Sequence, residues 1–162
     1  MLHRQTEQLH GAAIGLDALP LLAVADVLAE AQWKALRALT PATGDLARGG
    51  TMMAEVIRKG GTLHYAAAGS SGLMAMADAC ELAGTFGIDP AQIAIHMAGG
   101  IPQGAAMPGD TEDDEISAQR VANHINNRDV VILISASGST PYVMRIAALA
   151  ATTGAKIIGI AN

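Results

Sequence analysis

The amino-acid sequence predicts an α/β fold in which helices pack against a parallel sheet. After about residue 60, short apolar runs alternate with longer segments of helical periodicity, the pattern of successive β-α-β units. The run DVVILIS at 129–135 is continuously apolar, as expected for a strand that is buried on both faces. Because helices that connect parallel strands cross over right-handedly, this pattern indicates a layered α/β domain.

Residues 1–48 are predicted to form an N-terminal helical arm, and residues 49–162 to form the α/β domain. The first 18 residues show no clear periodicity. From Leu21 to Leu39, apolar side chains recur at helical spacing. Pro20 and two acidic side chains interrupt this apolar segment, so we expect an amphipathic helix rather than a membrane span.

The predicted elements of the domain follow one another as helices and strands. Thr51 is expected to cap a short helix, MMAEVIRK, which Gly60 and Gly61 close. Four strands are predicted, at 62–69, 91–97, 129–135 and 155–161. Three helices are predicted between them, from a Ser-Gly loop to about Leu82, from the acidic run DTEDDE to about Ile125, and from Thr140 to Thr153.

The fourth predicted strand is apolar and ends close to Asn162, with no helix after it to cover its face. An open apolar edge strand invites pairing with other chains. Either another chain covers this strand, or the sequence lacks a C-terminal part of the domain. We expect the second.

Composition excludes several classes of function. The formal charge is −5 and aromatic residues make up 2% of the chain, whereas nucleic-acid binding needs clustered Lys and Arg and stacking aromatic rings. Cys80 is the single cysteine, which excludes a disulfide framework and a multi-cysteine zinc site, and we expect a reduced, buried thiol. The histidines at 64, 96 and 124 lack helical metal-ligand spacing. We therefore expect no metal, no cofactor, no nucleic-acid or membrane partner and, without a secretory signal, a cytoplasmic protein.

Two loops rich in glycine and hydroxyl side chains follow the first and third predicted strands. Their candidate anion-binding residues are Gly69, Ser70, Ser71 and Gly72 in the first loop and Ser135, Ser137, Gly138, Ser139 and Thr140 in the second. Each loop opens a helix, whose free N–H groups and partial positive charge stabilise an anion. The alternative is that both loops only turn the chain, with Pro141 setting a helix start. In a flavodoxin-like strand order the two loops would meet at the topological switch point, which favours the anion site.

The familiar nucleotide-binding motifs are absent from this sequence. No G-x-G-x-x-G follows the first strand, no G-x-x-x-x-G-K-[ST] is present, and no acidic residue closes the second strand to hold a ribose. We therefore expect the anion to be the phosphate group of a small metabolite.

The two loops and the residues between them resemble the sugar isomerase (SIS) domain family of phosphosugar-binding proteins. The matching motifs are Gly-[Ser/Thr]-Ser-Gly at 69–72, Asp-Ala-x-Glu at 78–81, Thr-Phe-Gly at 85–87, Ala-Gly-Gly at 98–100 and Ala-Ser-Gly-x-Thr-Pro-Tyr-Val at 136–143. The resemblance covers about residues 50–162, and within the family it is strongest to the N-acetylmuramic acid 6-phosphate etherases.

This resemblance implies a three-layer α/β/α domain with a parallel, flavodoxin-like sheet, a homodimeric assembly, and a sugar phosphate held by both loops. It also implies cleavage of a lactyl ether by elimination and then hydration, with two glutamates as acid and base. The first glutamate corresponds to Glu81. The second corresponds to Thr111 without a gap, or to Glu112 with one inserted residue, and we assign the role to Glu112.

Several positions depart from the etherase pattern. Leu73 and Ser139 stand where etherases have arginines, and full-length etherases continue well past Asn162. Two alternatives therefore remain beside the etherase, namely an aldose–ketose phosphosugar isomerase, which returns the abstracted proton to C1, and a non-catalytic phosphosugar sensor. His96 lies near a strand end and is either structural or an aid to sugar ring opening.

Overall fold

The computed structural model describes residue 6 and residues 8–162, and the chain divides after Gly50 into two compact units. In the first unit, short 3-10 turns precede helix α1, which spans Leu21–Ala38. Helix α2, Thr43–Arg58, begins in the first unit and ends in the second. No helix in the described part of the chain is long and apolar enough to cross a membrane.

Helix α2 begins eight residues before the predicted cap, at Thr43 rather than after Thr51. Asp45 lies in its first turn, where a negative charge suits the positive end of a helix. Gly49 and Gly50 therefore lie inside a helix, at a cost of about 1 kcal/mol each. Burial of Val56 and of its apolar neighbours in the last turns offsets this cost, which the local sequence pattern does not reveal.

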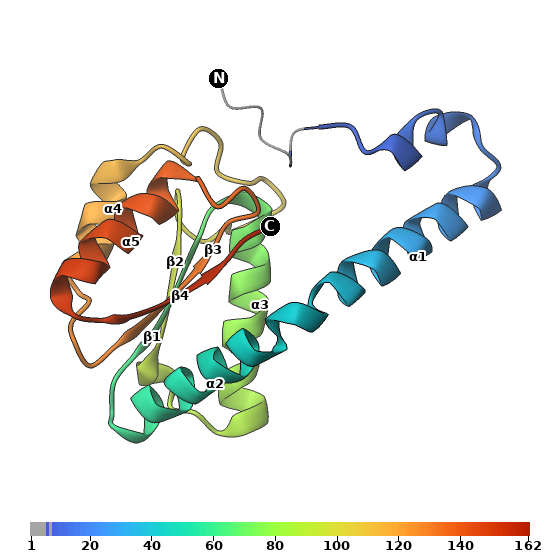
Figure 1. Cartoon of the computed structure of the whole chain (residues 1–162). Coiled ribbons are helices and arrows are strands. Elements are labelled where there is room, and N and C mark those ends of the chain that lie inside the picture. Colours follow the sequence, from blue (N-terminus) through green and yellow to red (C-terminus); the bar gives the residue numbers. More distant parts are fainter. Residues whose placement is uncertain (1–5, 7) are drawn as a thin grey trace. The chain divides into compact units, whose positions relative to one another are not determined.

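The second unit contains a four-stranded parallel sheet with the strand order β2-β1-β3-β4 (Figure 1). The strands are β1 Leu63–Ala67, β2 Ile93–Met97, β3 Val130–Ile134 and β4 Lys156–Ile160. At the carboxyl end of β1, Ala67 lies beside Met97 of β2 and Ile134 of β3. This order is flavodoxin-like and confirms the predicted fold class, with the first and third strands adjacent.

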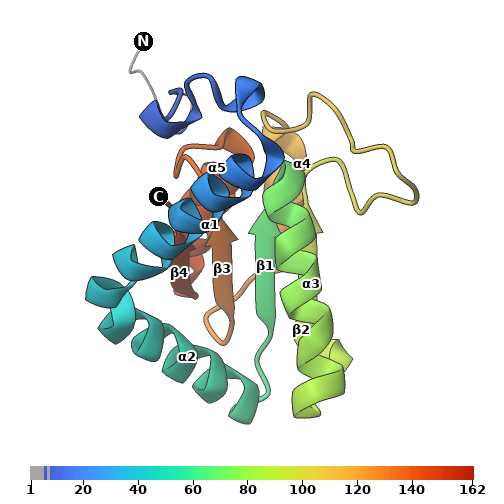
Figure 2. The same ribbon diagram turned by 90° about the vertical axis from the view of Figure 1, so that its right-hand side faces the viewer.

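Helices cover both faces of the sheet, so the domain has three layers (Figure 2). Helix α3, Gly69–Phe86, packs on one face, while α4, Glu115–Ala122, and α5, Pro141–Thr153, lie on the other. Successive side chains of a strand point to opposite faces. Tyr65 of β1 therefore belongs to the apolar core under α3, and Ala66 to the core under α4 and α5.

Two helix boundaries differ from the prediction. Helix α3 continues one turn beyond Leu82 and stops where Gly87 adopts a left-handed conformation, with φ of 65°. Helix α4 begins at Glu115, after most of the acidic run, because Asp114 is the residue that caps it by accepting a hydrogen bond from the Ser117 N–H. The acidic run is therefore mainly the loop that leads into α4.

A tight contact between Gly61 and Arg128 joins the segments that lead into β1 and β3. A Cβ atom on Gly61 would overlap the backbone carbonyl of Arg128 and would lie 2.9 Å from Cγ1 of Val56. We expect Gly61→Ala to lower the free energy of unfolding by about 3 kcal/mol, since the carbonyl cannot move without displacing β3. Urea denaturation measures this loss.

A matched control is Gly159→Ala on β4, because nothing lies within 4 Å of a Cβ atom built there. We expect that variant to change the free energy of unfolding by less than about 0.5 kcal/mol. Equal stabilities of the two variants would contradict the contact at Gly61.

Candidate functional site

The two hydroxyl-rich loops lie side by side at the carboxyl edge of the sheet, because β1 pairs directly with β3. Neighbouring strands are about 4.8 Å apart, so helices α3 and α5 begin next to each other. The first hydrogen bond at the start of α3 runs from the Gly72 N–H to the Ala68 carbonyl, at 3.3 Å. The N–H groups of residues 69–71 precede that bond and have no carbonyl of the same helix to pair with. The first loop is therefore itself the N-terminal turn of α3.

The second loop is held in shape by its own hydroxyl groups. The Ser135 and Thr140 hydroxyls lie 2.9 Å apart, and the Ser139 hydroxyl donates to Ser137 Oγ at 3.0 Å. Gly138 adopts a left-handed conformation, with φ of 65°, that turns the chain toward α5. Pro141 is the first residue of α5, as predicted.

Glu112 lies between the starts of the two helices. Its Oε1 atom is 3.5 Å from the position that a Cβ atom on Gly69 would occupy. Its carbonyl oxygen accepts a hydrogen bond of 2.8 Å from the Tyr142 N–H in the first turn of α5. The side chain of Thr111 instead packs against Gly99. The acidic side chain at the first loop is therefore that of Glu112.

Glu81 lies away from the two loops. It is 12 residues after Gly69 on α3, which corresponds to about 18 Å along the helix axis. Glu81 is exposed, and the Thr85 hydroxyl donates a hydrogen bond of 2.9 Å to its Oε2 atom. Within one chain, α3 does not bring Glu81 to Glu112. The preceding residue, Cys80, is exposed rather than buried as predicted, because it lies on the outer face of α3.

Neither loop contains a lysine or an arginine. Leu73 and Ser139 occupy the two positions at which the resemblance to the etherases implies arginines, and Leu73 is partly exposed at the start of α3. Positive potential at this edge therefore comes from the ends of α3 and α5 and from hydroxyl dipoles. Among the described residues, no group of three or more His, Cys, Asp and Glu side chains is arranged to hold a metal ion.

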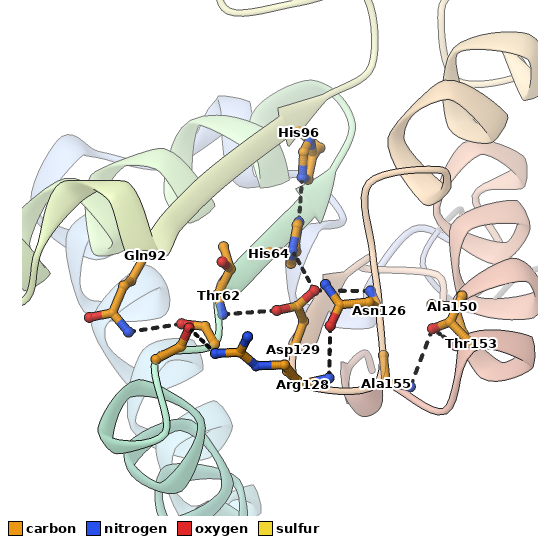
Figure 3. A network of polar contacts seen from close by, with 12 residues as sticks. Thr62, His64, Gln92, His96, Asn126, Arg128, Asp129, Ala150, Thr153 and Ala155 are labelled. Carbon is orange, nitrogen blue, oxygen red and sulfur yellow. Dashed lines mark hydrogen bonds and ion pairs between the residues drawn. The ribbon is translucent and has the colours of Figure 1, made fainter.

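Sequence reasoning missed a buried polar network on the face of the sheet that α4 and α5 cover (Figure 3). Nδ1 of His64 lies 2.9 Å from Nε2 of His96, and the two rings are nearly parallel, with centroids 5.2 Å apart. Nε2 of His64 lies 3.5 Å from a carboxylate oxygen of Asp129. Burial lowers the pKa of both histidines, that of His96 to about 4 with further contributions from the charges of His64 and His124. Only the register of β1 against β2 brings the two rings together.

A second pair that the sequence did not reveal links the sheet to α3. The buried Tyr65 hydroxyl donates a hydrogen bond of 2.6 Å to Asp78 on α3. Burial, followed by this bond to a negative charge, raises the pKa of Tyr65. The pair holds α3 against β1.

Comparisons with known proteins agree with this fold. A family model described as the SIS domain matches residues 26–162. An N-acetylmuramic acid 6-phosphate etherase from Deinococcus radiodurans is 35% identical over 98% of this chain and 53% of its own length. A second protein of that name, from Rippkaea orientalis, is 34% identical over 98% of this chain and 52% of its own length. The chain thus spans about half the length of these curated relatives.

Two solved structures share the fold. A phosphoheptose isomerase from Francisella tularensis superposes with a TM-score of 0.61 at 20% identity, over 88% of this chain and 76% of the other. The phosphoheptose isomerase of Neisseria gonorrhoeae gives a TM-score of 0.60 at 19% identity, over 87% and 74% of the two chains. At these sequence identities, the similarity shows a shared fold.

Proposed function

This chain belongs to the SIS domain family, and we propose that it binds a phosphosugar at the carboxyl edge of its sheet. The observation that carries this proposal is the pairing of β1 with β3, which sets the free N–H groups of the first turn of α3 and four hydroxyl groups of the second loop at one edge. A phosphate held there needs no cationic side chain. The candidate ligands are those predicted from the sequence, residues 69–72, 135 and 137–140. The proposal requires neither a metal nor a cofactor.

We further propose an etherase reaction on N-acetylmuramic acid 6-phosphate or a related amino-sugar phosphate. The support is the identity of about a third to relatives of that name, and a carboxylate, Glu112, beside the first loop. In an open-chain sugar the C1 aldehyde acidifies the C2 proton. A base removes that proton, the electrons form the C2–C3 double bond, and the C3–oxygen bond breaks as an acid protonates the departing ether oxygen. Addition of water across the double bond completes the reaction.

Acid and base are assigned to Glu81 and Glu112. Since about 18 Å of α3 separates Glu81 from the first loop, one chain does not supply both carboxylates to one ligand. A homodimer in which α3 of a second copy approaches the loops would supply the missing group. The proposed etherase reaction therefore requires a homodimer.

Two other functions are compatible with the fold. The solved structures of similar fold are named phosphoheptose isomerases, which favours an aldose–ketose isomerase as the second candidate. A non-catalytic phosphosugar sensor is the third, favoured by the absence of cationic side chains in both loops.

One experiment separates the three functions. The protein is incubated in D2O with N-acetylmuramic acid 6-phosphate, and separately with glucose 6-phosphate, and the C2 proton and lactate are followed by NMR. Lactate release supports the etherase, and C2 exchange with ketose formation supports the isomerase. Binding without either reaction, unchanged by Glu81→Gln, would overturn both enzymatic functions and leave the sensor.

The phosphate site also predicts the effect of a methyl group at Gly69. Gly69 has φ of 56°, and its added Cβ atom would lie 3.5 Å from the Glu112 carboxylate. We expect Gly69→Ala to weaken binding of glucose 6-phosphate by at least about tenfold, which corresponds to about 1.4 kcal/mol, because the methyl group enters the space between the loop and Glu112. Isothermal titration calorimetry measures the change.

Gly87→Ala is the matched control for backbone strain. Gly87 has φ of 65° and nothing within 4 Å of its Cβ position. Both variants should lose about 1–2 kcal/mol of folding free energy through the left-handed conformation, whereas only Gly69→Ala should lose affinity. Equal affinities of the two variants would place the ligand elsewhere.

A further inference from the structure

We propose that Asp129, His64 and His96, which contact one another in this order, orient the His96 ring so that its Nδ1 atom accepts a hydrogen bond from a hydroxyl group of the bound sugar. This subsite rests on the proposed phosphosugar function and deepens it, since it adds a contact to the sugar where the two loops would hold only the phosphate. The three side chains lie in a row from the buried Asp129 to the half-buried His96 (Figure 3).

Asp129 provides the negative charge at the buried end of this row of side chains. It is 3% exposed, and its two carboxylate oxygens accept hydrogen bonds from the backbone N–H groups of Thr62, at 3.0 Å, and Asn126, at 2.9 Å. Both partners are donors, as an ionised carboxylate requires. Asp129 therefore sets a fixed negative charge 3.5 Å from Nε2 of His64.

This charge decides between two proton arrangements. The 2.9 Å contact between Nδ1 of His64 and Nε2 of His96 needs one proton between the two atoms. In the first arrangement, Nδ1 of neutral His64 carries this proton. Nε2 of His64 then has a buried lone pair that no donor satisfies and that faces the Asp129 carboxylate. If Nε2 of His96 carries it, Nε2 of His64 is also protonated and both N–H groups point along the chain toward Asp129. The second arrangement is the one that electrostatics favours.

The same assignment leaves Nδ1 of His96 without a proton. Among the described residues Nδ1 has no hydrogen-bond partner, and it is not one of the fully buried polar atoms that lack one. His96 as a whole is half-buried, and its Nδ1 atom is not fully buried. Burial, the charge of His64 and that of His124 lower the pKa of His96 to about 4. At neutral pH the ring is therefore a neutral acceptor rather than a cation.

His96 lies within reach of a sugar whose phosphate sits at the first loop. It is in register with Ala66, which is one strand spacing away and three residues before Gly69. With about 4.8 Å between strands and about 3.3 Å per residue along a strand, His96 and Gly69 are about 11 Å apart at their Cα atoms. His96 also lies on the face of the sheet that α4 covers, the helix that Glu112 precedes.

Long-range ¹H–¹⁵N correlation NMR of the histidine rings at pH 7 tests the tautomers directly. We expect His64 and His96 both to carry the proton on Nε2. Protonation of His64 on Nδ1 would make Nδ1 of His96 a donor and overturn the proposal. Asp129→Asn should shift the balance of tautomers at His64. If that variant does not fold, His64→Gln is used in its place and the tautomer of His96 is measured.

A titration followed by the same spectrum tests the subsite. Glucose 6-phosphate is expected to move both the amide signals of residues 69–72 and the Nδ1 signal of His96, whereas inorganic phosphate should move only the amides. Amide shifts without a response of His96 would overturn the subsite and leave the phosphosugar function standing. No response of either would overturn the proposed function and the subsite with it.

His96→Gln should weaken glucose 6-phosphate binding by about tenfold while leaving inorganic phosphate binding unchanged, because one hydrogen bond to the sugar is lost. His124→Gln is the matched control, since His124 is exposed after the end of α4 and should leave both affinities unchanged. An equal loss of affinity for glucose 6-phosphate and for inorganic phosphate in His96→Gln would indicate that His96 has a structural role only, and would overturn the subsite.

Discussion

Glutamine in place of Glu112 is expected to lower lactate release from N-acetylmuramic acid 6-phosphate by about 10²–10⁴-fold, the usual contribution of a positioned acid or base. The carboxylate lies 3.5 Å from the Cβ position of Gly69, and its backbone carbonyl is bonded to the Tyr142 N–H. The substitution keeps this backbone bond and removes only the titrating group. Lactate is measured enzymatically or by NMR under saturating substrate, so that the loss is read in kcat.

Asp113→Asn is the control for this experiment, because Asp113 is the next residue in the same loop and is also exposed. We expect it to retain activity within about a factor of three. A similar loss in both variants would mean that the acidic loop acts through its overall charge. Retention of activity in Glu112→Gln would remove Glu112 from the chemistry and favour the phosphosugar sensor.

Acidification from pH 6.5 to 4 is expected to destabilise the domain by about 2–3 kcal/mol through His96. In the unfolded chain His96 titrates near pH 6.5, whereas in the folded chain burial and the neighbouring His64 and His124 lower its pKa to about 4. The unfolded state therefore binds more protons within this window. The contribution of His96 to the free energy of unfolding is therefore present above about pH 6.5 and is lost as the pH falls toward 4.

Urea denaturation at pH 7 and at pH 4.5 measures the effect. His96→Gln cannot titrate, so the difference in its unfolding free energy between the two pH values should be smaller than that of the wild type by about 2 kcal/mol. His124→Gln, which removes an exposed histidine, should keep most of the wild-type difference. An unchanged difference in His96→Gln would mean that His96 titrates normally in the folded chain.

Much of the domain was predictable because its signals are local. Each apolar run became a strand within one or two residues of its expected bounds, and Pro141 became the first residue of α5. The start of α2 was not predictable in this way. The pair Gly49-Gly50 reads as a break, yet packing of the apolar side chains that follow them carries the helix through.

The candidate site was predictable in its residue types and only partly in its geometry. The sequence placed a hydroxyl-rich loop after each of two strands, and the adjacency of the loops depended on a strand order that the sequence does not display. The choice between Thr111 and Glu112 required knowing which side chain packs on Gly99 and which lies at Gly69. The position of Glu81 required the direction of α3, which leads away from the loops.

The sequence by itself determined the α/β class, the two hydroxyl-rich loops and the family, because periodicity, turn residues and motifs are properties of neighbouring residues. Only the tertiary structure decided which distant side chains meet. His64 and His96 are 32 residues apart, and Asp129 is 65 residues after His64. Their contact depends on the register of three parallel strands, which crossover helices and two apolar cores set together. No local pattern encodes that register.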